Sequence, residues 1–248
     1  MPRIQLDYNS QVLKKEVHLQ ILHPTPRKFE GPHPVLYLLH GLMVDETAWL
    51  RYTMLEQYAK DKNLIIVMPD GGRSYYLNQK NGPDYNRLIT KELPKIIGNI
   101  FHISDKKEDT FIAGMSMGGY GAMLAGLGNP DQYGKVMSIS GVIDIESIYD
   151  NKTKGLRTFE VENMFGENSP KGTANDLYKL SRDLIDSDKQ SPDLYLLCGN
   201  EDSLIDQNKE YVDTFKDSLP IKQAFESGNH DFDYWNKAIK KVIDALTA

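Results

Sequence analysis

One serine of this 248-residue chain stands in a setting that suits a nucleophile. Ser116 lies between Gly114 and Gly118, in a G-x-S-x-G string that follows an apolar run at 110–113 and precedes a helical pattern at 117–127. A sharp turn from strand to helix exposes a serine hydroxyl above the edge of a sheet, and the glycines avoid collisions with neighbouring backbone. The string therefore predicts a nucleophilic serine. The alternatives are a glycine-rich helix start that binds phosphate, or a string that serves packing alone.

The histidines narrow the choice of a general base. The chain has six of them, and His230 alone follows Ser116. In folds that place a nucleophilic serine in such a strand-to-helix turn, the acid and then the histidine come later in the chain than the serine. His230 stands in a turn-rich loop, 227–232, just before the last helical pattern. We therefore expect His230 to take the proton of Ser116.

The loop at 199–204, which follows an apolar run, offers two carboxylates for the third position. Asp202 is preferred over Glu201 because aspartate is the commoner choice and Asp202 lies deeper in the loop. Its role would be to hold the imidazole of His230 in the correct tautomer and to stabilise the imidazolium. A solvated loop carboxylate, or the cap of the following helix, is the alternative for both acids.

An acyl-transfer reaction also needs two N–H donors for the developing oxyanion. One should be the backbone N–H of Met117, directly after the nucleophile. The other should come from the string His40-Gly41-Leu42, which follows the apolar run at 35–39, and Leu42 is the preferred donor. His40 is expected to brace this loop.

Strands and helices that alternate along the chain must position these residues. Continuous apolar runs, which are typical of strands covered on both faces, occupy 35–39, 64–68, 110–113, 136–139 and 194–198. An earlier, partly exposed antiparallel strand is expected within 12–22. Helical patterns cover 47–60, 85–101, 177–184, 206–219 and 232–246, and Pro94 should kink or divide the second. The alternation predicts an α/β fold, with a mostly parallel central sheet and helices on both faces, in a single domain, 1–248.

One polar segment, 150–176, interrupts this alternation. We expect a cap-like insertion over the carboxyl edge of the sheet, where ligands bind in open α/β sheets, although a plain surface loop is equally open. Its apolar residues would then form a wall of the acyl pocket, or at least one would anchor the segment to the core; they are Phe159, Met164 and Phe165. Three aromatic residues elsewhere are further candidates for the pocket, with the core as their alternative: Trp49, Tyr75 and Tyr76.

Composition limits the partners and cofactors. The net charge of −6 gives no general attraction to nucleic acid or to anionic lipid. The first residues lack a signal-peptide pattern, and no apolar run approaches the ~18 residues of a membrane-spanning helix. The lone cysteine, Cys198, excludes an intrachain disulfide, and no His, Asp and Glu residues have metal-ligand spacing. We expect a cytoplasmic protein that binds a small molecule, without metal or cofactor; homo-oligomerisation is left open.

Taken together, several strings resemble the esterase D family of α/β-hydrolases, and within it the tributyrin esterases of bacteria. The strings span nearly the whole chain: 39–42 with Asp45 and Trp49, 66–70, 111–121, 198–202 and 228–235. The resemblance implies an α/β-hydrolase fold, no cofactor and the hydrolysis of esters with short acyl chains. Carried over to this sequence, it implies a catalytic triad of Ser116, Asp202 and His230.

Other branches of that family hydrolyse S-formylglutathione, release feruloyl groups or transfer mycolyl chains. The S-formylglutathione branch usually has a histidine before the serine, another where Tyr120 stands, and a cysteine soon after the first oxyanion loop. This chain has Met115, Tyr120, and Val44 or its neighbours there. The departures favour a serine carboxylesterase acting on tributyrin-like or acetyl esters. S-formylglutathione hydrolase and a feruloyl or acetyl-xylan esterase are the alternatives; an acyltransferase or a non-catalytic binding relative is less expected.

Overall fold

The central feature of the molecule is one mixed sheet. The computed structural model describes residues 1–25, 28–150 and 156–247, and in these ranges eight strands pair in the order β1-β2-β4-β3-β5-β6-β7-β8. The pairs β1–β2 and β2–β4 are antiparallel, and all others are parallel. The strands are β1 (Arg3–Asn9), β2 (Glu16–Leu22), β3 (Val35–Leu39), β4 (Ile65–Pro69), β5 (Thr110–Met115), β6 (Lys135–Ile139), β7 (Asp193–Gly199) and β8 (Ile221–Glu226).

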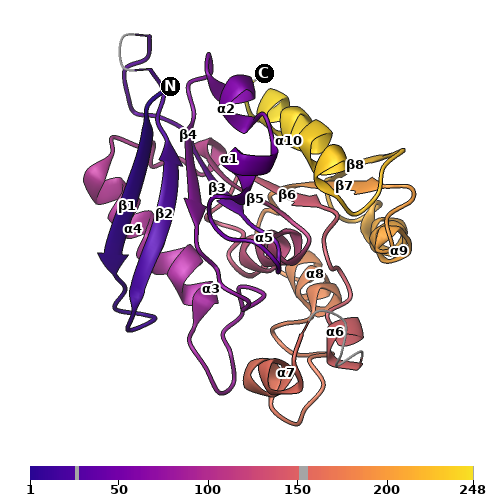
Figure 1. Cartoon of the computed structure of the whole chain (residues 1–248). Helices are drawn as coiled ribbons and strands as arrows, with labels where there is room; N and C mark the ends of the chain where they lie inside the picture. Colours follow the sequence, from indigo (N-terminus) through magenta and orange to yellow (C-terminus); the bar gives the residue numbers. More distant parts are fainter. Residues whose placement is uncertain (26–27, 151–155, 248) are drawn as a thin grey trace.

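Both faces of the sheet are covered, as the continuous apolar runs predict (Figure 1). Along β3, Val35, Tyr37 and Leu39 belong to one buried cluster, whereas Leu36 and Leu38 belong to the other. This alternation follows from the two-residue period of a strand, which sends successive side chains to opposite faces. The mostly parallel α/β architecture with helices on both faces is therefore confirmed.

Each face has its own set of helices. One face packs against α1 (Ala48–Tyr52), α2 (Leu55–Ala59) and α10 (Phe232–Leu246). The other packs against α4 (Leu93–Ile100), α5 (Met117–Gly128), α8 (Leu177–Ile185) and α9 (Ile205–Phe215). No helix of the described residues is both long and apolar enough to cross a membrane.

The helical pattern at 85–101 is divided, as Pro94 predicts. A short α3 (Tyr85–Arg87) leads into the π-helical turn η1 (Leu88–Glu92), and α4 begins at Leu93. Pro94 thereby occupies the first turn of α4, where a missing N–H costs little because that group has no partner within the helix. The pattern at 47–60 is likewise two short helices, α1 and α2.

The segment at 150–176 is helical in part. Residues 151–155 lie outside the described residues; around them stand α6 (Glu146–Asp150) and α7 (Thr158–Phe165), which Figure 1 shows together at one end of the molecule. The backbone of α7 accepts hydrogen bonds from Lys80 and Asn81, in the connection that follows β4. Arg73 in the same connection forms an ion pair with Glu160 at 2.6 Å. The segment is therefore attached to the loops at the carboxyl end of β4.

Candidate active site

Ser116 occupies a strained turn between β5 and α5. Its φ and ψ are 53° and −117°, a conformation that a residue with a side chain adopts only at a cost of about 1–3 kcal/mol. Its N–H donates to Ile139 O at 2.9 Å, and its carbonyl accepts from Tyr120 N at 3.1 Å. These bonds fasten the turn to β6 and to the first turn of α5, so the serine is held rigidly at the helix start.

The two glycines of the string are required by close backbone approaches. A Cβ at Gly114 would lie 2.3 Å from Gly118 O, and a Cβ at Gly118 would lie 2.6 Å from Leu39 O and 2.7 Å from His40 O. All three distances are far below a van der Waals contact. The helix after the serine can therefore press against β5 and the end of β3 only when both positions lack a side chain.

The three predicted catalytic side chains form one hydrogen-bonded chain. His230 Nε2 lies 3.0 Å from Ser116 Oγ, and His230 Nδ1 lies 2.9 Å and 3.1 Å from the two carboxylate oxygens of Asp202. The geometry assigns the Nδ1–H tautomer to a neutral imidazole, since Asp202 can only accept when ionised and Nε2 faces the hydroxyl. A serine hydroxyl facing an acceptor nitrogen can lose its proton as it attacks a carbonyl carbon.

The electrostatics of Asp202 suit its place in this chain. The side chain is completely buried, and burial alone would raise the pKa of its carboxyl. Hydrogen bonds from His230 and from the N–H of Leu204, at 2.8 Å, outweigh burial and hold this pKa below its ordinary value. A carboxylate that stays ionised without water can stabilise the imidazolium that forms on His230.

Glu201, the other candidate acid, has a different partner. Its Oε2 accepts from Gly228 N at 2.6 Å, and its own N–H donates to Gly228 O at 3.1 Å. Glu201 therefore clamps the loop that carries His230 to the loop that carries Asp202. The sequence favoured Asp202 as the acid, but it carried no signal for this clamping role of Glu201.

The side chains of His40 and Tyr76 brace the loop at 40–42, which should supply the second oxyanion donor. His40 Nδ1 donates to Gly41 O at 2.7 Å and His40 Nε2 accepts from Gly71 N at 2.8 Å, which confirms the bracing role expected of His40. Tyr76 adds a second brace, because its hydroxyl accepts from His40 N at 3.0 Å and donates to His40 O at 3.2 Å. The sequence offered no signal for this role of Tyr76.

This brace holds the loop beside the nucleophile. A Cβ at Gly41 would lie 3.6 Å from the Cβ of Ser116, so the loop touches the serine. In the described part of the chain, neither the N–H of Leu42 nor that of Met117 donates to a protein acceptor. The first N–H groups of a helix are free in any case, and that of Met117 is the first of α5. Both groups are therefore available to an oxyanion.

The expected pocket residues are mostly buried. Trp49 and Tyr76 have no exposed surface, and the indole N–H of Trp49 donates to Leu39 O at 3.1 Å, so both belong to the core. Tyr75 is also buried and meets Tyr120 edge to face. Their packing corresponds to the alternative expected for these aromatic residues, which is a place in the core.

The apolar residues of the 150–176 segment divide into two kinds. Met164 and Phe165 are buried in the larger core cluster, which corresponds to the anchoring role. Phe159, at the start of α7, is 51% exposed, and the Arg157 guanidinium lies over its ring. Of these three side chains, Phe159 is thus the one that is largely exposed.

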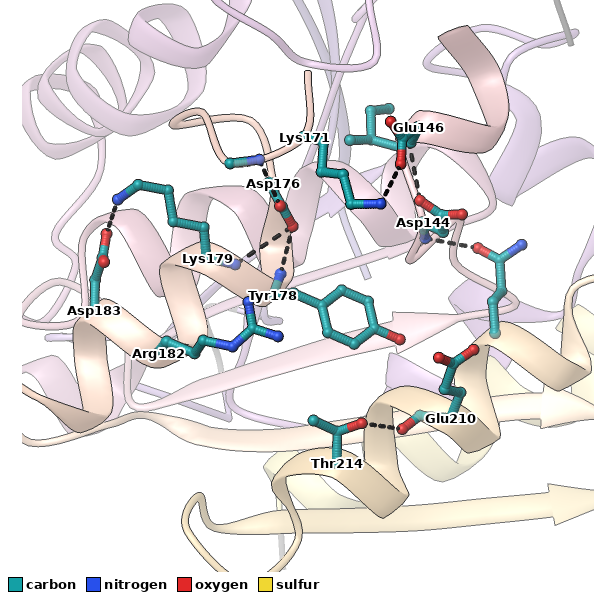
Figure 2. Close-up of a pocket in the computed structure, with 13 residues that line it drawn as sticks. Asp144, Glu146, Lys171, Asp176, Tyr178, Lys179, Arg182, Asp183, Glu210 and Thr214 are labelled. Carbon is teal, nitrogen blue, oxygen red and sulfur yellow. Dashed lines mark hydrogen bonds and ion pairs between the residues drawn. The ribbon is translucent and has the colours of Figure 1, made fainter. Parts of the chain in front are cut away.

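One cavity of the molecule is not lined by the triad. It measures about 620 Å³ and opens between α8, α9 and the start of α6 (Figure 2). Its walls carry charges of both signs, with Glu146 paired to Lys171 at 2.8 Å, and Ser116, Asp202 and His230 are not among the residues that line it. We do not assign the catalytic site to this cavity, because size alone does not outweigh the hydrogen-bonded chain. Among the described residues, no group of three or more His, Cys, Asp or Glu side chains could hold a metal ion.

Comparison with known proteins adds solved structures of the same fold. A serine hydrolase of Staphylococcus aureus, described as fluorophosphonate-binding serine hydrolase F, is 32% identical, with a TM-score of 0.94 over 100% of this chain and 98% of that one. An S-formylglutathione hydrolase of the same organism is also 32% identical, with a TM-score of 0.89 over 100% and 99% of the two chains. The eight-stranded sheet is thus that of an α/β-hydrolase.

Sequence comparison points to esters. An acetyl esterase of Caldicellulosiruptor saccharolyticus is 27% identical over 264 residues, covering 100% of this chain and 98% of the relative. The family model described as "Putative esterase" matches residues 10–245. This match covers nearly the whole chain and includes all three residues of the hydrogen-bonded chain. The protein therefore belongs to this esterase family and is a carboxylic ester hydrolase of the serine hydrolase type.

Proposed function

We propose that this protein is a serine carboxylesterase that hydrolyses esters of short acyl chains through an acyl-enzyme on Ser116. The observation that carries the proposal is the continuous chain of hydrogen bonds from Asp202 through His230 to Ser116. A lone buried acid, a lone histidine or a lone strained serine would each have a structural explanation. The three in this order and at these distances form a nucleophile, its base and the group that orients the base.

The reaction proceeds in two halves. His230 Nε2 takes the hydroxyl proton while Ser116 Oγ forms a bond to the ester carbonyl carbon, and the N–H groups of Leu42 and Met117 receive the oxyanion. The C–O bond to the alcohol then breaks, and His230 returns the proton to the leaving alcohol. Water enters, His230 takes one of its protons, and the hydroxide adds to the acyl carbon. Collapse of this second intermediate releases the carboxylic acid and returns the proton to Ser116.

The direct test is the variant Ser116→Ala, assayed with p-nitrophenyl acetate and butyrate. Removal of a triad nucleophile costs on the order of 10⁶ in turnover, so hydrolysis should fall to the background rate. Ser218→Ala is the matched control, since Ser218 is exposed in the turn before β8, and it should keep full activity. A folded Ser116→Ala protein that retains a tenth of the wild-type rate would overturn the proposal.

The preference for short chains is tested with p-nitrophenyl esters from C2 to C12. Each buried CH₂ contributes ~0.8 kcal/mol, about fourfold in affinity, until the chain meets the pocket wall. We expect kcat/KM to rise from acetyl towards butyryl and to fall by octanoyl. A profile that rises steadily through dodecanoyl would contradict a closed acyl pocket. Product analysis with added alcohol separates hydrolysis from acyl transfer.

S-formylglutathione hydrolysis is the second candidate, because one of the 32% identical structures is of such an enzyme. The residues at the two histidine positions of that branch speak against it. Met115 is buried in the core, and Tyr120 is buried with its hydroxyl donating to Asn175 O at 2.7 Å. Measuring kcat/KM for S-formylglutathione, methyl ferulate and p-nitrophenyl acetate with the same preparation distinguishes the candidates.

A further inference from the structure

Ser140 is a buried serine directly after β6, the strand next to β5, which Ser116 follows. The register of β6 and β7 pairs Ile139 with Leu197, and Ser140 extends this pairing by donating its N–H to Leu197 O at 2.7 Å. Ser140 therefore lies alongside Cys198, just before the turn that presents Asp202. The turn is tight, since Asp202 N donates to Gly199 O at 3.2 Å.

The backbone of Ser140 is strained. Its φ is +48°, in the left-handed region that glycine adopts freely and residues with a side chain adopt at a cost. Glycine would occupy this position with less strain. A serine at this strained position must offer an advantage that glycine lacks. The only difference between the two residues is the hydroxymethyl group of the serine.

The hydroxyl of Ser140 is also buried and has no hydrogen-bond partner among the described residues. The pairing with Leu197 nevertheless places Ser140 beside the turn of Asp202. Burial raises the pKa of the Asp202 carboxyl, and the Ser140 side chain is one of the groups that lower it. For Cys198, burial dominates and raises the pKa of the thiol to about 12, although the Ser140 side chain acts to lower it. Cys198 therefore stays uncharged. The carboxylate is therefore the charged acceptor within reach of this hydroxyl.

The carboxylate has room for another donor. One oxygen of Asp202 accepts from both Leu204 N and His230 Nδ1, whereas the other accepts from His230 alone. A carboxylate offers about four lone-pair sites. Hydrogen bonds of a catalytic site are often long or poorly aligned in the resting state and tighten when charge develops.

We propose that Ser140 is a positioning residue for Asp202, whose hydroxyl donates to the free side of the carboxylate and holds it towards His230 while His230 carries the proton of Ser116. This inference rests on the proposed triad. Ser140 does not touch the reacting atoms, and its effect reaches Ser116 only through Asp202 and His230. No bond is made or broken at Ser140, and its proton stays on its own oxygen.

Ser138 provides a matched control for this role. It lies two residues earlier on β6, is equally buried, and also has a hydroxyl without a well-aligned partner. Its hydroxyl, however, packs against the backbone of Gly119 and Gly141, where it would lie 2.8 Å and 2.0 Å from an added Cβ. Ser138→Ala thus removes the same group from the same strand without altering the surroundings of Asp202.

The experiment measures kcat and KM for p-nitrophenyl acetate in Ser140→Ala, Ser140→Gly and Ser138→Ala, in wild-type and Asp202→Ala backgrounds. We expect both Ser140 variants to lose about tenfold in kcat with KM unchanged, and Ser138→Ala to lose less than twofold. Ser140→Gly guards against misfolding, because glycine relieves the backbone strain and should keep or raise the thermal midpoint. In the Asp202→Ala background the Ser140 changes should have no further effect, since the group they position is gone.

Three results would overturn the inference: full activity of both Ser140 variants, equal losses in Ser138→Ala, or the same tenfold loss in the absence of the Asp202 carboxylate. These failures are distinguishable from failure of the proposed function. If Ser116→Ala abolishes hydrolysis while Ser140→Gly has wild-type kcat, the triad stands and the role of Ser140 falls. If Ser116→Ala remains active, both fall.

Discussion

Replacing Asp202 with asparagine tests the triad by changing only what the side chain can donate and accept. The carboxylate accepts from Leu204 N–H at 2.8 Å and from His230 Nδ1 at 2.9 Å. In Asp202→Asn the amide oxygen would keep the bond from Leu204, because an unpaired buried N–H is costly. The amide NH₂ would then face Nδ1 of His230. The imidazole would have to accept at Nδ1 and carry its proton on Nε2, facing the hydroxyl of Ser116 as a donor.

A histidine in that tautomer cannot take the serine proton. We expect kcat for p-nitrophenyl acetate to fall by ~10⁴, which corresponds to about 5.4 kcal/mol of transition-state stabilisation. The thermal midpoint at pH 7 should change little, since volume and most hydrogen bonds are kept, and it is measured on the same preparation. Retention of a tenth of the wild-type kcat by a folded Asp202→Asn protein would refute the assignment of the acid.

Glu201→Gln is the matched control for this change. The Glu201 carboxylate accepts from Gly228 N at 2.6 Å, and a glutamine oxygen can accept the same bond. The loop of His230 should therefore keep its position, with a loss in kcat below tenfold. If Glu201→Gln were the more damaging of the two changes, the acid of the triad would have to be reassigned to Glu201.

Two further predictions concern the segment around α7 and the support of the oxyanion loop. Met164→Ala should lower the free energy of unfolding in urea by about 2–5 kcal/mol, because the Met164 side chain is buried in the core. Phe159→Ala should change this free energy by less than about 0.5 kcal/mol, because Phe159 is exposed, and it should extend the tolerated acyl chain. An unchanged ester profile in Phe159→Ala would mean that this ring is not a pocket wall. The His40 side chain, whose Nε2 lies 3.6 Å from Asp70 Oδ1, and the N–H of Gly72, which donates to the same oxygen at 2.8 Å, outweigh burial and lower the pKa of Asp70 from 3.8 to about 2. Since the folded pKa is the lower one, the resulting stability is present above pH 4 and is lost as the pH falls towards 2, by at most about 2 kcal/mol. Asp70→Asn should remove this part of the acid dependence of unfolding, and Asp188→Asn at an exposed position should not. Equal acid dependence in Asp70→Asn and wild type would contradict the assignment.

The hydrogen-bonded chain of Asp202, His230 and Ser116 could be predicted because each of its residues follows the end of a strand. Ser116 comes after β5, Asp202 after β7 and His230 after β8. Carboxyl ends of parallel strands meet at one edge of a sheet, so residues far apart in sequence must come together there. The prediction needed only the order of the residues along the chain and the turn chemistry around the serine.

Two strands lacked a signal in the sequence. β1 and β8 form the two edges of the sheet and are partly exposed along their whole length. Neither has the continuous apolar run of a strand covered on both faces, and the short alternation in β1 is mixed with charged residues. The early strand expected within 12–22 is β2, which begins at Glu16 and is mostly buried.

The pocket wall was the least predictable part of the site. An aromatic residue that follows a strand has the same sequence signature whether it faces a ligand or the core. Tyr76 illustrates this: its ring fills the space beside Gly71 and Gly121, where an added Cβ would lie 2.2 Å and 2.5 Å from it. This packing depends on residues 5 and 45 positions away in the chain, so the local sequence pattern around Tyr76 does not predict it.

Backbone strain marks the same edge of the sheet independently of any motif. Among the described residues other than glycine, five have positive φ, and four of them lie in the connections after β4, β5 and β6: Tyr75, Tyr76, Ser116 and Ser140. Each such conformation costs about 1–3 kcal/mol and persists only where surrounding bonds enforce it. The hydrogen bonds from the Tyr76 hydroxyl to His40, from Ser116 N to Ile139 and from Ser140 N to Leu197 are such bonds. Part of the stability of the fold is thus offset by holding the proposed nucleophile, the loop of the proposed oxyanion donors and the neighbour of the proposed catalytic acid in fixed positions, which is the arrangement that preorganised acyl transfer requires.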